Sequence, residues 1–283
     1  MRTRNRIPPL RHLLLALFSV LAGLFIVSPL AVVVLNSFSS VAYNVFPPEG
    51  YSLRWYRNLA GQDAFYGAAV RSVVLALVAT SVSLVVGTMA AYALVRYRIP
   101  GSDMVKAFLL SPIVMPKIVL GVALFMFFVE VGSLNSYWSL VVTHAVVTLP
   151  FVIAILSASL VSFDWTLQEA AMDLGAGPLY TFFRVVLPQI SVSMIVAAVF
   201  SFIISFDQVE TTVFLVRPSS NTLPIEMFLY LQKWQDPTIA ALSTVLIGFA
   251  IVLVVILTVL FGKGALPTRL AAGQKAAQKE ESS

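Results

Sequence analysis

The fold is decided by an uninterrupted apolar stretch near the start of the chain, which reads LLLALFSVLAGLFIVSPLAVVVL from Leu13 to Leu35. A helix rises about 1.5 Å per residue, so about 20 apolar residues cross the roughly 30 Å hydrocarbon core of a bilayer. The apolar core of a signal peptide is shorter, about 7 to 15 residues, and a small-residue cleavage site follows it. No clear site of that kind follows Leu35, so we interpret the stretch as a retained membrane helix.

The rest of the chain has the same character. Of its 283 residues, 59% are hydrophobic and 11% are charged, whereas about a quarter of a typical soluble domain is charged. Backbone polar groups must be satisfied within lipid, and the apolar stretches do not alternate in polarity as barrel strands do, so each is expected to be a helix. The sequence therefore predicts an all-α polytopic membrane protein with six transmembrane helices, at about Leu13–Leu35, Ser72–Val95, Ala107–Val129, Trp138–Phe163, Val185–Val216 and Pro237–Gly262.

The positions of the basic residues predict the orientation of these helices. If the N-terminus is inside, 12 of the 18 Lys and Arg residues fall in cytoplasmic segments, five fall outside, and Lys117 lies within a span. Short cytoplasmic loops retain positive charge, so both termini are expected to be cytoplasmic. The expected organisation is a cytoplasmic tail over residues 1–12, a transmembrane domain over residues 13–262, and a polar cytoplasmic tail over residues 263–283. Aromatic residues in the outer segments, about 36–66 and 217–236, fit contact with membrane lipid.

Composition and missing motifs exclude several functions. The net charge of +5 comes from basic residues at the ends of apolar stretches and not from one basic face, so no nucleic-acid partner is expected. The chain has no cysteine, which rules out disulfides and thiolate chemistry. It also has no His-Glu-x-x-His, Gly-x-Ser-x-Gly or phosphate-loop motif. An intramembrane enzyme is therefore disfavoured, and ATP hydrolysis by this chain is not expected.

The polar loop between the fourth and fifth predicted spans, about residues 164–184, has the pattern of a short helix. Thr166 and Glu169 have capping-box spacing, Gly175 suits a C-terminal cap, and Pro178 suits the first turn of a second helix. Either a partner protein covers the apolar side of this helix, or the helix lies in the membrane interface. That apolar side comprises Leu167, Ala170, Ala171, Leu174 and Leu179.

The same loop resembles the cytoplasmic signature of binding-protein-dependent ABC importer permeases. That family pattern is Glu-Ala-Ala, three residues, Gly, nine residues, usually Ile, one residue, and Leu-Pro. The chain departs from it only at Val185, where the family usually has Ile. The segment from Ser52 to Tyr56 also resembles the family's outer segment. The matching residues of the loop are Glu169, Ala170, Ala171, Gly175, Val185, Leu187 and Pro188.

The resemblance implies a type I ABC importer permease fold in a bacterial inner (plasma) membrane. It assigns the matching loop residues to coupling with an ATPase, because in such permeases this loop sits in a cleft of the ATPase subunit. The implied partners are two ATPase subunits, a second permease that completes a hetero-dimer, and an extracytoplasmic solute-binding protein. ATP and Mg would be bound by the partner ATPase, and no cofactor or metal by this chain.

Charges at membrane depth are costly, so they mark a candidate pathway. Asp207 and Glu210 lie three residues apart in the fifth predicted span and are expected to share a helix face. They either line a hydrated pathway or mark the outer end of the span. Lys117 in the third span either pairs with a carboxylate or takes part in transport. His144 is expected to be a hydrogen-bonded interior residue.

Three further expectations concern the cargo, the shape of the third span and the energy source. Residues 205–210 and the pair Leu223-Pro224 resemble spermidine/putrescine-type permeases, which implies a polyamine or another amine or amino-acid-like cargo. Pro112 and Pro116 are expected to break or kink the third span. An ion- or proton-coupled secondary transporter is the alternative class, since it also needs kinked helices and buried charges. The intact loop signature favours the ABC importer.

Overall fold

The computed structural model describes residues 9–97, 99–217 and 219–262. The predicted tail over residues 263–283 and most of the predicted tail over residues 1–12 lie outside this range. Within it the secondary structure is helical apart from one isolated antiparallel bridge between Ser39 and Tyr51. The described chain divides into two compact units, one formed by residues up to 62 together with those from 230 onward, and the other by residues 63–229. The division falls within helix α11 (Leu223–Lys233).

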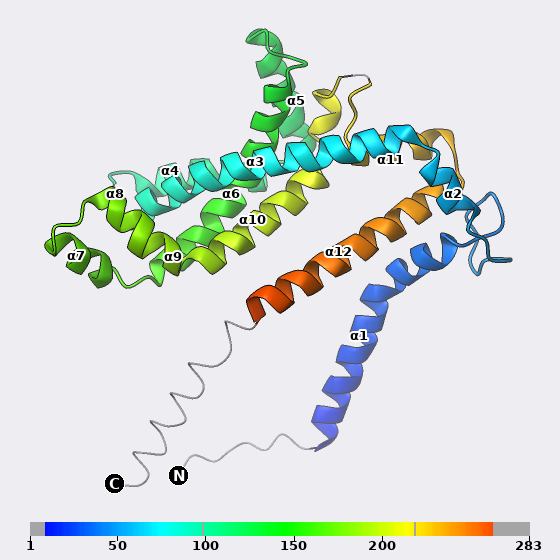
Figure 1. Cartoon of the computed structure of the whole chain (residues 1–283), viewed down its shortest axis with the longest axis horizontal. Helices are drawn as coiled ribbons and strands as arrows, with labels where there is room; N and C mark the ends of the chain where they lie inside the picture. Colours follow the sequence, from blue (N-terminus) through cyan, green and yellow to red (C-terminus); the bar gives the residue numbers. More distant parts are fainter. Residues whose placement is uncertain (1–8, 98, 218, 263–283) are drawn as a thin grey trace. The chain divides into compact units, whose positions relative to one another are not determined.

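The first unit contains α1 (Pro9–Asn36), α2 (Arg54–Ala60) and α12 (Thr238–Gly262), and α12 packs against both other helices (Figure 1). The connection between α1 and α2 is held by hydrogen bonds. Trp55 is 4% exposed and donates from Nε1 to the Ser39 carbonyl oxygen at 2.7 Å. Asn58 donates to the Thr238 hydroxyl at 2.8 Å and so joins α2 to the start of α12.

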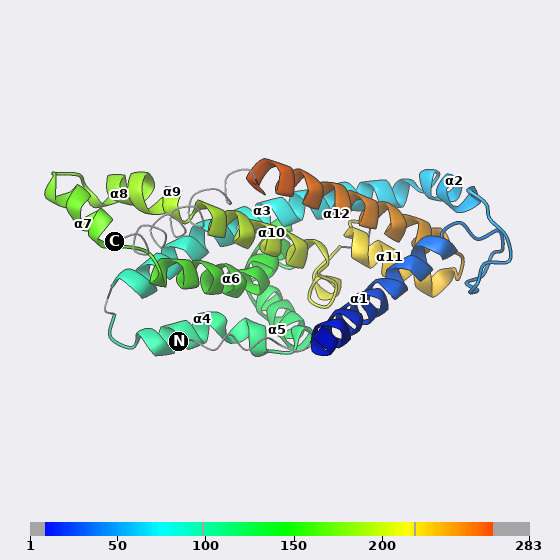
Figure 2. The same ribbon diagram turned by 90° about the horizontal axis from the view of Figure 1, so that it is seen from below.

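The second unit is built on three helices that lie side by side, α3 (Asp63–Arg96), α6 (Tyr137–Val161) and α10 (Ser191–Phe206) (Figures 1 and 2). Small residues allow α3 to approach α6 closely. A Cβ atom at Gly87 would lie 2.6 Å from Cγ1 of Val152. Ser83 lies four residues before Gly87 on α3, is buried, and shares a 2.7 Å hydrogen bond with Thr148 of α6. Small residues on this face of α3 therefore allow the two helices to pack closely.

Two predicted spans are bent helix pairs. Helices α4 (Ser102–Val114) and α5 (Lys117–Glu130) meet at an angle of 108°. The break lies directly before α5 at Pro116, which has no N–H to continue the helix, whereas Pro112 lies inside α4. The second pair bends by 75° after residue 189. It joins α10 to three short elements, α8 (Pro178–Thr181), the π-helical turn η1 (Phe182–Val186) and α9 (Leu187–Gln189).

The described helices agree in part with six spans. Three single helices, α1, α3 and α6, are long and apolar enough to cross a bilayer, and the two bent pairs raise the number to five. Helix α12 contains a shorter apolar stretch, from Thr238 to Val252. The predicted span Val185–Val216 is too long, because α10 ends at Phe206 and is followed by an irregular segment with one turn of 3-10 helix, η2 (Thr212–Phe214).

Candidate functional site

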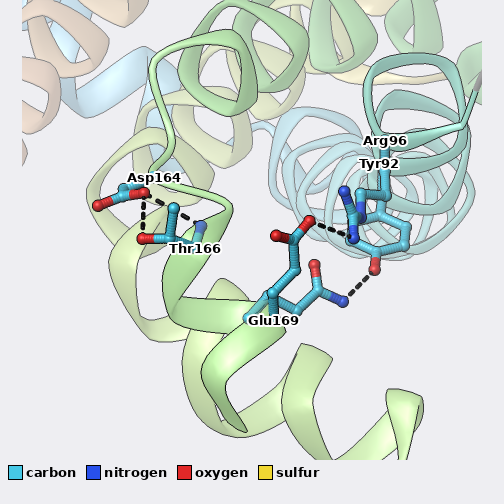
Figure 3. Close-up of polar contacts among 6 residues, drawn as sticks. Tyr92, Arg96, Asp164, Thr166 and Glu169 are labelled. Carbon is cyan, nitrogen blue, oxygen red and sulfur yellow. Dashed lines mark hydrogen bonds and ion pairs between the residues drawn. The ribbon is translucent and has the colours of Figure 1, made fainter. Parts of the chain in front are cut away.

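The loop between α6 and α8 contains α7 (Thr166–Asp173), and the Asp164 carboxylate binds the first residue of this helix. Oδ1 of Asp164 accepts hydrogen bonds from the Thr166 hydroxyl at 2.7 Å and from its N–H at 3.1 Å (Figure 3). These two bonds lower the pKa of the Asp164 carboxyl below its usual value. The predicted capping box is therefore wrong, since Thr166 donates to an earlier carboxylate and Glu169 binds elsewhere.

The C-terminus of α7 ends in a Schellman motif at Gly175. The Gly175 N–H donates to the Met172 carbonyl at 2.9 Å, and the Ala176 N–H donates to the Ala171 carbonyl at 3.1 Å. Gly175 has φ of +90°, a conformation that residues with a Cβ rarely adopt. No atom of the described residues lies within 4 Å of where its Cβ would be. The predicted cap is confirmed, and the backbone, not the packing of this chain, requires glycine here.

One side of α7 is bound to the end of α3. Oε1 of Glu169 accepts from Nη2 of Arg96 at 3.1 Å (Figure 3), and the Arg96 guanidinium lies 5.1 Å from the centre of the Trp165 ring. Gln168 is 2% exposed and donates from Nε2 to the Tyr92 hydroxyl at 2.7 Å. Sequence reasoning did not select Tyr92, Trp165 or Gln168, because only the fold brings residues 92–96 next to residues 165–169.

Aromatic and aliphatic side chains also pack against the loop and hold it in place. The Tyr92 ring lies 5.0 Å from that of Phe182 and 6.0 Å from that of Trp165, measured between centres. Val185 and Leu187, two residues of the sequence signature, are partly buried against a core that contains the fully buried Val186. These two signature positions therefore support the loop from within this chain. Pro188, the last signature residue, is exposed close to the 75° bend.

The other side of the loop is apolar and uncovered. Leu174 is 90% exposed and Leu179 is 74% exposed, and Tyr180 and Phe183 are exposed by 62% and 58%. Ala170 is exposed as well, whereas Ala171 is half-buried. The expected apolar surface is thus confirmed, and it also includes Tyr180 of α8 and Phe183 of η1, which were not predicted. A helix that is fixed on one side and bare on the other is suited to docking a partner.

A second polar constellation lies where α10 ends. Nζ of Lys117, at the start of α5, is 3.8 Å from Oε2 of Glu210. The same carboxylate oxygen accepts from Nε2 of Gln208 at 3.2 Å, and Gln208 is 1% exposed. Of the two alternatives for Lys117, the structure shows pairing with a carboxylate. Asp207 is exposed and directly follows α10, whose last residue is Phe206, so the predicted helix face shared by Asp207 and Glu210 is wrong.

Neighbouring helices hold this irregular segment in place from two sides. A Cβ atom at Gly121 of α5 would lie 2.9 Å from Cα of Thr211 and 3.1 Å from the Glu210 carbonyl oxygen. On the other side His144 of α6 is 1% exposed and hydrogen-bonds Ser205 at 2.8 Å and Thr212 at 3.0 Å. The predicted interior role of His144 is confirmed. Among the described residues no group of three or more His, Asp or Glu side chains is arranged to hold a metal ion.

Long apolar helices, two bent helix pairs and an exposed helical loop define the class of protein, a helical protein with several segments able to cross a membrane. No protein-family model matches the chain. Over 240 residues it is 33% identical to the spermidine/putrescine transport system permease protein PotC of Haemophilus influenzae, covering 85% of this chain and 92% of that protein. It is 31% identical over 254 residues to the putrescine transport system permease protein PotI of Escherichia coli K12, covering 86% of this chain and 89% of that protein.

A solved structure supports the fold. The crystal structure of a bacterial ABC transporter involved in the import of the acidic polysaccharide alginate matches with a TM-score of 0.70 at 16% identity, covering 94% of this chain and all of that one. The chain belongs to the family of ABC importer permeases that includes PotC and PotI. It is a permease subunit and not an enzyme, and ATP hydrolysis belongs to a separate ATPase.

Proposed function

We propose that this chain forms half of the pathway of a bacterial inner-membrane importer for polyamines or a related cationic amine. The chain crosses the membrane six times and keeps both termini in the cytoplasm, so that α7 and α8 face the ATPase. It works with two ATPase subunits, which bind ATP and Mg, with a second and different permease, and with an extracytoplasmic solute-binding protein. The names of PotC and PotI, which are spermidine/putrescine and putrescine permeases, support the cargo class.

The observation that carries the coupling proposal is the asymmetry of the α7 loop. Its inner side is fixed to α3 through Glu169 and Gln168, and its outer side presents Leu174 and Leu179 without cover from this chain. A rigid helix seated in a cleft of the ATPase would transmit a displacement of that subunit to α3 and α10 as a lever. Seven residues serve this coupling, Val185 and Leu187 by supporting the loop from within the fold: Glu169, Ala170, Ala171, Gly175, Val185, Leu187 and Pro188.

The carboxylates near the end of α10 support a cationic cargo. Glu210 lies next to Lys117, and Asp207 is exposed without an ion pair to any described residue. Charged side chains in a membrane domain are rare and mark substrate pathways. A cargo amine passing this point would meet Asp207 and Glu210 as counter-charges, and the Lys117 ammonium as the charge that it displaces from Glu210. Asp207, Glu210 and Lys117 are therefore the proposed pathway residues.

The test uses the tagged full chain in its native membranes. After gentle solubilisation, mass spectrometry identifies the co-purifying subunits, and vesicles report ATP-driven uptake of labelled putrescine and spermidine. We expect Leu174→Glu to lose the co-purifying ATPase and uptake together. Leu53→Glu is the matched control, because Leu53 is also exposed, by 57%, and is predicted to face the opposite side of the membrane. Equal ATPase recovery from both variants would refute the coupling proposal, and ATP-driven uptake of neither amine by the unmodified transporter would refute the cargo.

A further inference from the structure

A cavity of about 160 Å³ lies in the unit of residues 63–229, and no part of the proposed transport mechanism uses it. By the same measure a single water molecule needs only ~10–15 Å³. The cavity lies between α3, the start of α6 and the segment that precedes α11. Its polar lining comprises Arg71, Arg217, Ser136, Tyr137, Ser220 and Thr222 together with Asn135, and its apolar lining is leucine.

The lining is positively charged and has no compensating acid. Neither Asp nor Glu is among the lining residues. Arg71 donates from Nε to the Asn221 carbonyl oxygen at 2.9 Å, which leaves its terminal nitrogens for another acceptor. In the described part of the chain the Arg217 guanidinium forms no ion pair or hydrogen bond. The nearby Glu226 is bound by the Asn221 side chain at 2.8 Å and does not line the cavity.

Two further features of the wall favour an anion. The N-terminus of α6 begins at the cavity, with Ser136 as its N-cap, and helix N-termini present N–H groups and a partial positive charge to anions. Thr222 is 4% exposed, and its hydroxyl has no hydrogen-bond partner among the described residues. A buried hydroxyl is nearly always paired. A ligand oxygen in the cavity would supply the partner that Thr222 lacks.

The surroundings of the cavity favour a position near the lipid headgroups. Tyr137 lines it and packs edge-to-face on Trp138, and these rings are 44% and 64% exposed. Exposed Tyr and Trp at a helix end are typical of the membrane interface. Arg71 directly precedes the predicted start of its span at Ser72. Arginine forks match the oxygens of a phosphate. We propose that this cavity binds a phosphate group, supplied by the headgroup of a phospholipid that lies against the unit.

The test measures lipid binding to the full transporter, purified with its co-purifying subunits and stripped of lipid with detergent. Native mass spectrometry follows the binding of added phosphatidylglycerol, whose headgroup carries one phosphodiester and no amine. Arg217→Gln is expected to weaken one binding event about tenfold, the equivalent of about 1.4 kcal/mol for one charge-assisted contact. Thr222→Val is expected to weaken the same event several-fold. Arg57→Gln is the matched control, because Arg57 does not line the cavity, and it should leave binding unchanged.

The outcomes separate the possible ligands. Equal phosphatidylglycerol binding by all variants would overturn the proposal, and weakened recovery of the solute-binding protein in that case would assign the arginines to a protein carboxylate. Inorganic phosphate at millimolar concentration tests the source: if it displaces the lipid from the Arg217-dependent event, the phosphate group is the recognised element. If inorganic phosphate binds there while lipid binding is independent of Arg217, the lipid source is wrong.

The lipid-binding measurements are designed to be independent of misfolding of the variants and of the identity of the transported cargo. Arg71 is left unchanged because its bond to Asn221 links α3 to the segment before α11, and its loss could unfold that segment. Arg217 and Thr222 make no such link within the described structure, and the thermal unfolding midpoint of each variant verifies this. Since amine uptake is not measured, a wrong cargo assignment and a wrong phosphate site give different results.

Discussion

The α7 loop and the irregular segment after α10 differ in what determines the path of their backbones. The caps of α7 lie within a few residues in the sequence, as Asp164 binds Thr166 and Gly175 binds Met172. The segment after α10 depends on distant helices, since Glu210 meets Lys117 from α5 and Thr212 meets His144 from α6. The two ends of α7 are thus locally determined, although the helix is attached to α3 by long-range contacts of Glu169 and Gln168. The other segment keeps its shape only while α5 and α6 enclose it, so substitutions should affect the two regions differently.

The largest effect is expected from Gly121→Ala, which attacks the enclosed segment. The new methyl group would lie 2.9 Å from Cα of Thr211 and 3.1 Å from the Glu210 carbonyl oxygen, and backbone atoms cannot rotate aside. Overpacking of this kind costs about 1–3 kcal/mol. A lower thermal unfolding midpoint of the purified transporter and weaker uptake are expected together. Gly248→Ala in α12 is the control, because no atom of the described residues lies within 4 Å of its added Cβ. A midpoint drop as large as that of Gly121→Ala would contradict the argument that the segment after α10 is enclosed.

The next effect, Gly175→Ala, concerns the locally determined loop. A residue with a Cβ pays about 1–2 kcal/mol at positive φ, but here the methyl group would meet no neighbour. The global unfolding midpoint should therefore change little, whereas ATP-driven uptake should fall because the docking turn is reshaped. Gly175→Asn should retain more uptake than Gly175→Ala, since Asn tolerates this conformation better. If Ala and Asn behave alike, the backbone requirement is not what limits coupling.

The difference between locally determined elements and elements held by distant helices also explains what the sequence could predict. The long apolar helices, the break at Pro116, the glycine cap and the exposed apolar side of α7 follow from local rules of length, backbone conformation and patterning. The predicted helix through Asp207 and Glu210 failed because the apolar pattern continues past Phe206. Hydropathy alone does not show that Gly121 and His144 hold this segment in an irregular shape.

The candidate sites divide in the same way. The spacing of Glu169 and Gly175 was enough to locate the loop. Its attachment through Tyr92 and Gln168 needed the fold, because these two residues are separated by 76 positions in the sequence. Pairing of Lys117 with a carboxylate was one of two sequence alternatives, but its partner Glu210 lies 93 positions away (210 minus 117). Long-range polar pairs leave no periodic signal in a single sequence. The sequence therefore left the role of Lys117 undecided and did not predict the Tyr92–Gln168 contact.

A smaller effect is expected from separating Lys117 and Glu210. Their side chains are 48% and 43% exposed, so the pair itself should contribute about 0.2–1 kcal/mol. Lys117→Gln and Glu210→Gln should each lower the unfolding midpoint slightly, and the double variant should lower it by less than the sum. Lys106→Gln is the control, since Lys106 forms no ion pair with a described residue. Strict additivity of the two substitutions would show that the 3.8 Å pair does not form in the membrane.

The smallest effect on stability should come from the Arg96–Glu169 pair on the locally determined loop. The side chains are 27% and 55% exposed, and an exposed pair contributes about 0.2–1 kcal/mol that salt screens further. Arg96→Lys should keep the charge but lose the planar contact with the Trp165 ring. We expect Glu169→Gln and Arg96→Lys to leave the unfolding midpoint nearly unchanged in high salt while uptake falls, because the direction of α7 relative to α3 depends on this contact. A large midpoint change with normal uptake would reverse that interpretation and make the pair a structural element of the bundle.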